Sequence, residues 1–289
     1  MSDQLTPNSK PVVGIIAQGQ MGSAVAKRLT DNGLTVLTNL EGRSAESSAR
    51  AKAARMQPVA LSQFAAADII LSVVPPGEAE TLALRLAPML EAGRKKPIYV
   101  DCNAVNPQTV ERIAAIIQTT ACPFVDGGII GGPPKPGYDG PSLYLSGLQA
   151  NAVAALDAFG LNCKVLDGPV GAASALKMSY AGITKGLTAL ASVMILAATR
   201  AGEATSLHAE LAESQPHLLA WFERQVPSMF SKAHRWVAEM EEIAGFVTAD
   251  PAGHELFQSA AEFYRRIAAD VADANAETAT LARFFDAKG

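Results

Sequence analysis

The sequence has few cysteines and no grouped metal ligands. Three cysteines occur among 289 residues, Cys102, Cys122 and Cys163. They are odd in number and widely spaced, which argues against a disulfide framework and favours buried thiols in a reducing compartment. Because no cluster of His, Cys and Asp has the spacing of a metal site, we predict no bound metal.

Charge and long uncharged stretches are also scarce. Charged residues make up 18% of the chain, and the formal net charge is −4, so no general surface for nucleic acid or anionic membranes is expected. The N-terminal ten residues are polar, without an apolar signal region. The most apolar helical stretch, 172–198, contains Lys177 and Lys185, and its uncharged part, 186–199, is too short to span a bilayer. We therefore expect a cytoplasmic protein with no membrane partner.

Hydrophobic residues form 49% of the chain, enough for a sizeable core. The first half alternates apolar strand patterns with helical patterns, which predicts a doubly wound, mostly parallel sheet of the α/β class. Strands are expected at 12–17, 35–39, 69–74, 98–101, 124–126 and 143–146, with helices at 22–32, 45–55, 78–89 and 107–119. Strand patterns vanish from Gly168 onward. The predicted domains are therefore a doubly wound α/β domain over 10–167 and an all-helical domain over 168–289, with helix breaks near 214–216, 225–227 and 249–253.

The most informative stretch is 12–22, where a β-branched run meets a turn of small residues and then a helix. Small residues at Ala17, Gly19 and Gly22 keep the spacing of a dinucleotide-binding fingerprint. Gly19 would let the backbone approach a pyrophosphate, and Gly22 would let the helix pack closely on the strand. The helix N-terminus would offer its N–H groups to the anion. We expect cofactor contacts at Ala17, Gln18, Gly19, Gln20, Met21 and Gly22, although a tight turn without a ligand gives the same pattern.

The segment after the second strand bears on the choice of cofactor. Glu41 could bind ribose hydroxyls, as in NAD enzymes, but Arg43 and Ser44 follow at once. A guanidinium and a hydroxyl together suit the 2′-phosphate of NADP. We expect NADP, with NAD as the second choice; a solvated loop is the alternative.

Two further strand ends carry candidate cofactor residues. Val74 and Pro75 close the third major strand, and Asn103 follows the fourth. Cofactors of doubly wound sheets lie at the carboxyl ends of the strands. Asn103 is a candidate for the nicotinamide ribose or carboxamide, or alternatively a turn-forming residue.

The glycine-rich stretch 127–132 and the apolar helix after Gly171 provide the candidate chemistry. Glycines around Ile130 would leave backbone N–H groups at Gly131 and Gly132 open to a substrate. Lys177 lies among apolar residues, where loss of hydration lowers the pKa of a lysine and suits proton transfer. Ser174 and Tyr180 share its helix face, and Lys185 is a weaker catalytic candidate. A lysine that extends to the surface is the alternative.

These motifs, in this order, resemble the β-hydroxyacid dehydrogenase family, relatives of 3-hydroxyisobutyrate and 6-phosphogluconate dehydrogenases. The resemblance rests on 19–22, on 101–104 in place of Asp-x-Ser-Thr, on 126–132 as the substrate loop, and on 168–171 followed by Lys177. It implies a Rossmann domain, a nicotinamide cofactor, a catalytic lysine at Lys177, and homodimers formed through the helical domain.

The departures from the family keep the substrate open. The serine of the substrate loop is Ile130 here, the asparagine four residues after the lysine is Ala181, and the later lysine is missing near Glu239. The main expectation is an NADP-dependent oxidoreductase acting on a small hydroxy or carbonyl substrate, of hydroxyacid type. The alternatives are an imine reductase-like enzyme, which Lys177 argues against, and a protein that binds NADP without turnover.

Overall fold

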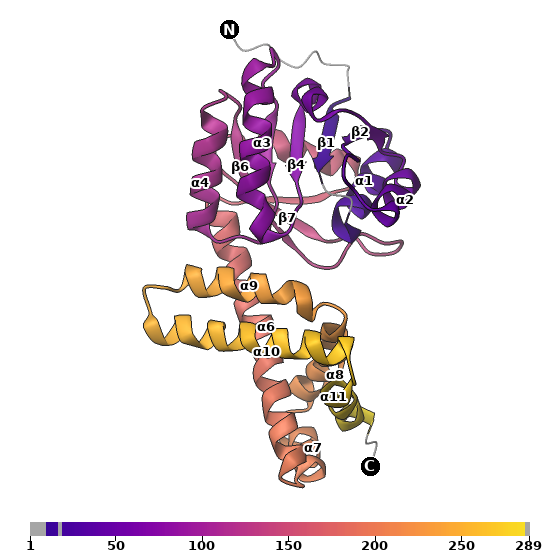
Figure 1. The fold of residues 1–289 in the computed structure, drawn as a ribbon, viewed down its shortest axis with the longest axis vertical. Helices are drawn as coiled ribbons and strands as arrows, with labels where there is room; N and C mark the ends of the chain where they lie inside the picture. The colour runs from indigo at the N-terminus through magenta and orange to yellow at the C-terminus, as the bar shows by residue number, and fades with distance from the viewer. Residues whose placement is uncertain (1–9, 17–18, 287–289) are drawn as a thin grey trace. The chain divides into compact units, whose positions relative to one another are not determined.

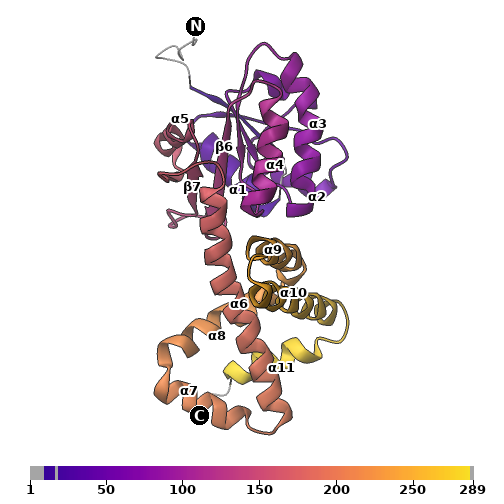
Figure 2. The same cartoon turned by 90° about the vertical axis from the view of Figure 1, so that its left-hand side faces the viewer.

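The computed structural model describes residues 10–16 and 19–286 of the chain. The chain forms two compact units, residues 1–177 and 178–289, which are considered separately below. Figures 1 and 2 show an α/β unit with a central sheet and a unit built of helices, which confirms the predicted fold class.

The first unit contains one sheet in the order β3-β2-β1-β4-β5-β6-β7-β8. All neighbouring strands are parallel except β6 and β7. The strands are β1 (Val12–Ile16), β2 (Thr35–Thr38), β3 (Gln57–Pro58), β4 (Ile69–Ser72), β5 (Ile98–Asp101), β6 (Phe124–Ile130), β7 (Ser142–Ser146) and β8 (Asn162–Val165). The helices are α1 (Gln20–Asp31), α2 (Ala45–Ala53), α3 (Ala79–Ala92), α4 (Pro107–Gln118) and α5 (Ala150–Ala154), with short 3₁₀ turns at 61–66, 76–78 and 155–159.

The sheet is covered on both faces because successive strand residues point in opposite directions. Ile15 belongs to the apolar cluster that contains Val25 and Leu29 of α1, together with residues of α2 and α5. Its neighbour Ile16 belongs to the other cluster, which contains Leu86 of α3 and residues of α4. Both views show α3 and α4 side by side over one face (Figures 1 and 2). This is the doubly wound arrangement that the alternating pattern predicts.

The structure extends one predicted strand through the first half of the glycine-rich stretch. Gly127 and Gly128 are part of β6, where they pair with Leu145 and Tyr144 of β7. The predicted end of this strand at residue 126 was wrong, because Gly127 and Gly128 allow close packing within and beside the sheet. A Cβ on Gly127 would lie 2.9 Å from the Asp101 carbonyl oxygen. Only Gly131 and Gly132 lie beyond the strand.

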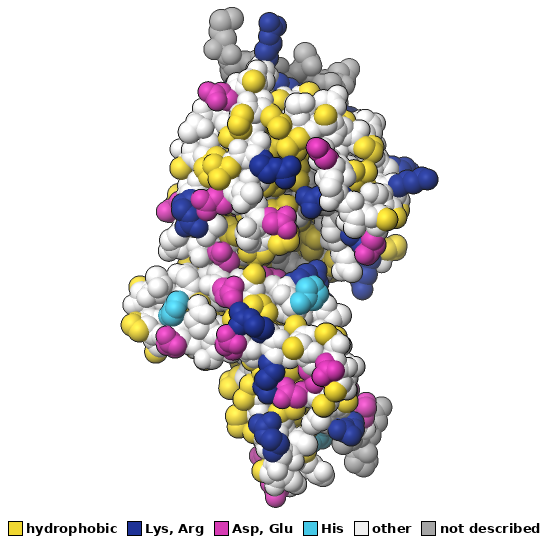
Figure 3. Space-filling model, in the orientation of Figure 1, with side chains coloured by type: hydrophobic (Ala, Val, Ile, Leu, Met, Phe, Trp, Pro, Cys, Tyr) yellow, Lys and Arg dark blue, Asp and Glu magenta, His cyan; other side chains and the backbone are white. Residues whose placement is uncertain are grey.

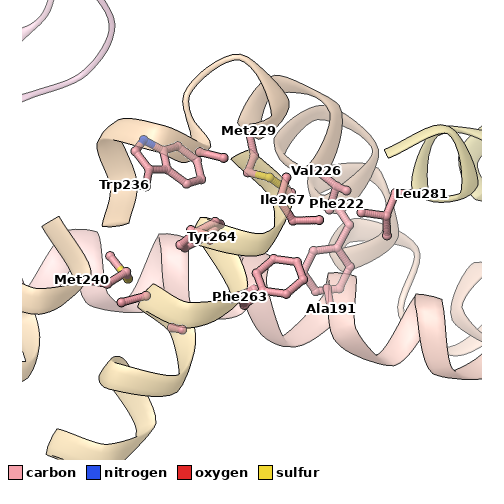
Figure 4. Close-up of a cluster of buried hydrophobic side chains, with 14 of the residues drawn as sticks. Ala191, Phe222, Val226, Met229, Trp236, Met240, Phe263, Tyr264, Ile267 and Leu281 are labelled. Carbon is pink, nitrogen blue, oxygen red and sulfur yellow. The ribbon is translucent and has the colours of Figure 1, made fainter. Parts of the chain in front are cut away.

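The second unit is all-helical, as predicted. It contains most of α6 (Ala172–Arg200), followed by α7 (Ala204–Ser214), α8 (Pro216–Phe230), α9 (Ala233–Phe246), α10 (Pro251–Ala272) and α11 (Ala276–Asp286). Its core joins Met240 of α9, Tyr264 of α10 and Phe222 of α8 (Figure 4). Trp236 packs edge to face on Tyr264, with ring centroids 5.2 Å apart.

The helix breaks at 214–216 and 249–253 agree with the structure, but the break at 225–227 was wrong. Pro227 lies inside α8. An interior proline removes one helical hydrogen bond, yet Phe222, Val226 and Met229 of the same helix are all buried. This burial along one face offsets the loss. The domain boundary at 167/168 stays a prediction, and the compact units divide ten residues later, after Lys177.

Among the described residues, α6 is the one helix long and apolar enough to cross a membrane by length and composition alone. Core helices of globular proteins pass the same test. Lys177 and Lys185 lie in the first half of this helix, and Arg200 is its last residue. The absence of a membrane partner and the cytoplasmic location stay predictions.

Candidate active site

The carboxyl ends of β1, β4, β5 and β6 meet at one edge of the sheet, because these strands are parallel. The predicted site residues of the first unit that follow these strands therefore share this edge: Gly19 to Gly22 after β1, Val74 and Pro75 after β4, Asn103 after β5, and Ile130 to Gly132 at the end of β6. Ala17 and Gln18 lie outside the described residues. The edge is the place where doubly wound sheets bind nucleotides.

Gly19 stands at the N-cap of α1, with extended backbone angles and an exposed surface. A Cβ built on it would meet no atom of the described residues within 4 Å. Gly22 is buried one turn later, as close packing of helix and strand requires. The first-turn N–H groups of a helix have no partner within the helix, and they carry its positive dipole end. The open space beside Gly19 therefore fits a diphosphate.

Arg43 and Ser44 lead into α2 from the turn after β2. The Ser44 hydroxyl caps α2 by accepting the Ser47 N–H at 3.2 Å. Among the described residues Arg43 makes no ion pair, whereas Arg50, within α2, pairs with Glu46. A half-buried guanidinium beside an exposed helix N-terminus is a suitable place for a phosphate group.

Asn103 is buried, and the protein occupies both ends of its amide. Its Oδ1 accepts the Val74 N–H at 2.6 Å, and its Nδ2 donates to Asp101 Oδ2 at 2.9 Å and to the Ser72 hydroxyl at 3.0 Å. These bonds join the ends of β4 and β5. They favour the turn-forming role over direct contact with nicotinamide, and the cofactor contact of this side chain stays a prediction. Pro75 is exposed beside them.

Asp101 is a fully buried carboxyl group at the same edge. Burial raises its pKa to about 7, hydrogen bonds from Asn103 oppose the rise, the Asp126 carboxylate adds to it, and the charge of Lys177 lowers it. Asp101 and Asp126 are paired in register on β5 and β6. Both Asp126 and Lys177 therefore act electrostatically on the buried Asp101, a pattern that is common in functional sites.

Asp126 was missed as a site residue, although a carboxylate inside an apolar strand is costly unless it is paired. Its Oδ2 accepts the N–H groups of Gly171 and Ser174, both at 3.0 Å, and the Ser146 hydroxyl at 3.1 Å. Its Oδ1 accepts the Ser174 hydroxyl at 2.7 Å. The Ser146 hydroxyl in turn accepts the Ala173 N–H at 3.1 Å. Ser174 is 1% exposed, which favours a positioning role for it over contact with a substrate.

Lys177 lies one helical turn after Ser174, where α6 approaches β6 at Gly128. A Cβ on Gly128 would lie 2.8 Å from the Ala173 carbonyl oxygen and 3.4 Å from the Lys177 Cβ. The base of the lysine side chain is therefore fixed against the strand that leads to Ile130. Tyr180 belongs to the helical unit and is 53% exposed, and its assistance to Lys177 stays a prediction.

The loop after β6 is held by a residue that was not predicted. Gly131 has φ +124°, which favours glycine, and Gly132 is exposed. Arg28 of α1 donates to the carbonyl oxygens of Tyr138 at 2.7 Å and Asp139 at 3.1 Å. The helix of the fingerprint thus holds the loop that carries the candidate substrate N–H groups.

Lys185, the second catalytic candidate, makes contacts that hold the helices of the helical unit together. It forms an ion pair with Glu239, and both side chains are largely buried. Its ammonium lies 5.1 Å from the centroid of the Trp236 ring. The Tyr264 hydroxyl donates to the Lys185 carbonyl oxygen at 2.6 Å. These contacts join α6 to α9 and α10, so they support the choice of Lys177 over Lys185.

Residues 12–166 match the model of a family described as the NAD binding domain of 6-phosphogluconate dehydrogenase. The chain belongs to this family. Residues 198–267 match a second model, a domain of unknown function (DUF1932). The sheet order and the position of Gly19 agree with this family match. Together they support an oxidoreductase with a nicotinamide cofactor.

Relatives extend the likeness over most of the chain. It is 28% identical over 238 residues to an uncharacterized 28.5 kDa protein of Methanothermus fervidus, covering 81% of this chain and 90% of that one. The structure of the conserved protein MTH1747, described as similar to 3-hydroxyacid dehydrogenases, is 26% identical, with a TM-score of 0.67 over 89% of this chain and 99% of that one. A 3-hydroxyisobutyrate dehydrogenase of Mycobacterium tuberculosis with L-serine shares the fold at 17% identity, with a TM-score of 0.69 over 94% of this chain and 99% of that one.

Proposed function

We propose that this 6-phosphogluconate dehydrogenase-like protein is an NADP-dependent oxidoreductase acting on a small hydroxy or carbonyl compound of hydroxyacid type. The observation that carries the proposal is the fixed position of Lys177 on α6, packed at Gly128 of β6 in the nucleotide-binding unit. A charged group costs free energy at such a place unless it is solvated, paired or used. The domains are proposed as 10–167 for the cofactor and 168–289 for substrate and dimer contacts.

In the proposed reaction the substrate exchanges one hydride with the nicotinamide and one proton with Lys177. The nicotinamide, when bound, accepts or supplies the hydride. In the oxidative direction the amine of Lys177 takes the proton of the substrate hydroxyl, and in reduction its ammonium returns a proton to the oxygen. The N–H groups of Gly131 and Gly132, beside Ile130, hold an oxygen of the substrate. Ser174 donates to Asp126 rather than to the substrate, and Tyr180 stands as a candidate assistant to the lysine.

Two alternatives rest on the departures from the family. The absence of the serine at Ile130 and of the asparagine at Ala181 favours an imine reductase-like enzyme, whereas Lys177 argues against it. A protein that binds NADP without turnover is the other alternative. Assays with hydroxyacids and NADP⁺, and with aldehydes, ketones and cyclic imines and NADPH, separate the three. Oxidation of hydroxyacids that depends on Lys177 is the expected result.

The cofactor preference gives one prediction. Replacing Arg43 by alanine should weaken NADPH binding about tenfold or more, because charge-assisted hydrogen bonds to the 2′-phosphate are lost. NADH binding should change little. Fluorescence titration of both reduced cofactors measures the two dissociation constants. Arg50→Ala, within the helix that follows Arg43, is the matched control, since Arg50 already pairs with Glu46. Equal losses for both cofactors, or a wild type that prefers NADH, would contradict the assignment.

The exposed side of α6 supports the proposed homodimer. Tyr180, Ile183, Leu187, Leu190 and Met194 recur at alternating intervals of four and three residues, and all five are exposed. Figure 3 shows hydrophobic side chains along the lower left edge of the helical unit, where Figure 1 draws the second half of α6. Such a heptad stripe suits the same stripe of a second copy.

Ile183→Glu and Leu190→Glu should each convert the dimer to monomers by burying a carboxylate in the interface. Light scattering after size-exclusion chromatography measures the mass. Leu84→Glu, on an equally exposed leucine of α3, should leave the dimer intact. A monomeric wild type, or a dimer that survives both changes on α6, would refute the interface.

A further inference from the structure

The helix that carries Lys177 has no capping side chain of its own. Gly171 precedes its first residue and has φ +100°, a conformation that favours glycine and so leaves the usual capping position without a side chain. The free N–H groups of a helix start need acceptors. Here the Ala172 N–H donates to the Pro169 carbonyl oxygen. The N–H groups of Gly171 and Ser174 donate to Asp126 of β6, and that of Ala173 donates to Ser146 of β7.

The main acceptor is the Asp126 carboxylate, which is fully buried. Four donors surround its two oxygens, two backbone N–H groups and two hydroxyls. An ionised carboxylate accepts four such bonds without donating any, and its negative charge interacts favourably with the positive end of the helix dipole. The cap therefore comes from β6, more than 40 residues earlier in the chain.

This remote cap fixes both the start and the rotation of α6. Because Ser174 is held by its N–H and by its hydroxyl, the first turn cannot rotate without breaking both bonds. Lys177 follows three residues later, against Gly128 of the strand that bears Asp126. Asp126 and Gly128 are two residues apart on β6, so the Asp126 side chain and the open side of Gly128 lie on the same face of the sheet.

We infer that Asp126 is a positioning residue, which acts through the N-terminal turn of α6 to place the Lys177 amine for proton transfer. The inference rests on the proposed function of Lys177. Asp126 does not touch the reacting atoms in this account; it sets the helix from which the lysine extends. An amine displaced by about 1 Å can cost as much as ~10²-fold in rate. Ser146 and Ser174 complete the same hydrogen-bonded unit.

The test compares Asp126→Asn with Ser174→Ala and the control Asp68→Asn. The asparagine preserves the shape and an acceptor oxygen but removes the charge. The alanine removes only the 2.7 Å hydroxyl bond, so it remains informative if Asp126→Asn fails to fold. Asp68 is a suitable control because its carboxylate also accepts a backbone N–H, from Val12 at 2.8 Å, at the opposite edge of the sheet.

Two readouts are needed on the full chain with NADPH bound. Hydrogen exchange of the segment 168–178 should become about tenfold faster in Asp126→Asn and change less in Ser174→Ala. With a substrate found in the screen, kcat should fall ~10–100-fold in Asp126→Asn, while KM and NADPH affinity stay within about threefold. Asp68→Asn should change neither the exchange of this segment nor kcat.

The outcomes separate this inference from the proposed function. Unchanged hydrogen exchange in both variants would show that Asp126 does not cap α6 in solution. Faster exchange with unchanged kcat would show that the cap stabilises the helix only, and it would overturn the positioning role of Asp126. A rise in KM that accounts for the whole loss overturns it as well. If the wild type binds NADPH but turns over none of the hydroxyacids, aldehydes, ketones or cyclic imines, the proposed function fails, and the exchange rates still decide whether Asp126 caps α6.

Discussion

Replacing Lys177 by methionine should lower turnover by ~10²-fold or more, because a positioned proton donor and acceptor is lost while the length of the side chain is kept. The fold should persist, since methionine is apolar and adaptable and suits the surface of an apolar helix. NADPH affinity should stay close to that of the wild type. Steady-state kinetics with the best substrate, thermal unfolding and cofactor titration measure the three quantities.

Lys185→Met is the matched control on the same helix. It leaves Glu239 largely buried without its ammonium partner, so it should reduce the stability of the helical unit. It should affect kcat far less than Lys177→Met does. Normal turnover in the Lys177 variant together with loss of activity in a folded Lys185 variant would show that the catalytic assignment is wrong by two helical turns.

Gly19→Val should abolish cofactor binding without unfolding the protein. The backbone and the space around Gly19 explain why the fold should persist and why binding should be lost. A Cβ at Gly19 meets no atom of the described chain within 4 Å, and the backbone there is extended, so the valine is accommodated. Its methyl groups then fill the space at the helix N-terminus that the pyrophosphate needs. Fluorescence titration with NADPH and a thermal melt measure the two effects.

A graded series makes the result more specific. Gly19→Ala adds one methyl group in the same open space and should weaken binding less than valine does. NADPH affinity that is unchanged in both variants would show that the stretch 12–22 forms only a structural turn. A variant that loses binding because it has unfolded is recognised by its melting curve.

The alternation of apolar strands and amphipathic helices predicted most of the fold, because each pattern reports burial directly. The short strands β3 and β8 were missed, since two or four partly exposed residues give no clear period. Pro227 predicted a break that tertiary packing prevents. The extension of β6 through Gly127 and Gly128 was missed because glycine normally weakens a strand. Here the neighbours at Asp101 and Ala173 leave no room for a Cβ.

The candidate site was only partly predictable for a related reason. Motif spacing selected Gly19, Arg43 and Lys177 as candidates, because those positions are adjacent to recognisable turns and helix starts. It could not show that the amide of Asn103 is occupied by Val74 and Asp101, since that depends on how two strands meet. The role of Asp126 depends on a hydrogen bond across 45 residues of sequence. The available signal was a carboxylate inside an apolar strand.

The proposed activity is transfer of hydride with the help of Lys177. The most direct measurement follows the reduced nicotinamide by absorbance. The wild type and Lys177→Met are mixed with NADP⁺ and a panel of small hydroxyacids, and with NADPH and the corresponding carbonyl compounds and cyclic imines. We expect turnover of at least one hydroxyacid or its carbonyl partner by the wild type, and a loss of ~10²-fold or more in the variant. Tight NADPH binding without turnover of any compound, or equal turnover by both proteins, would contradict this expectation.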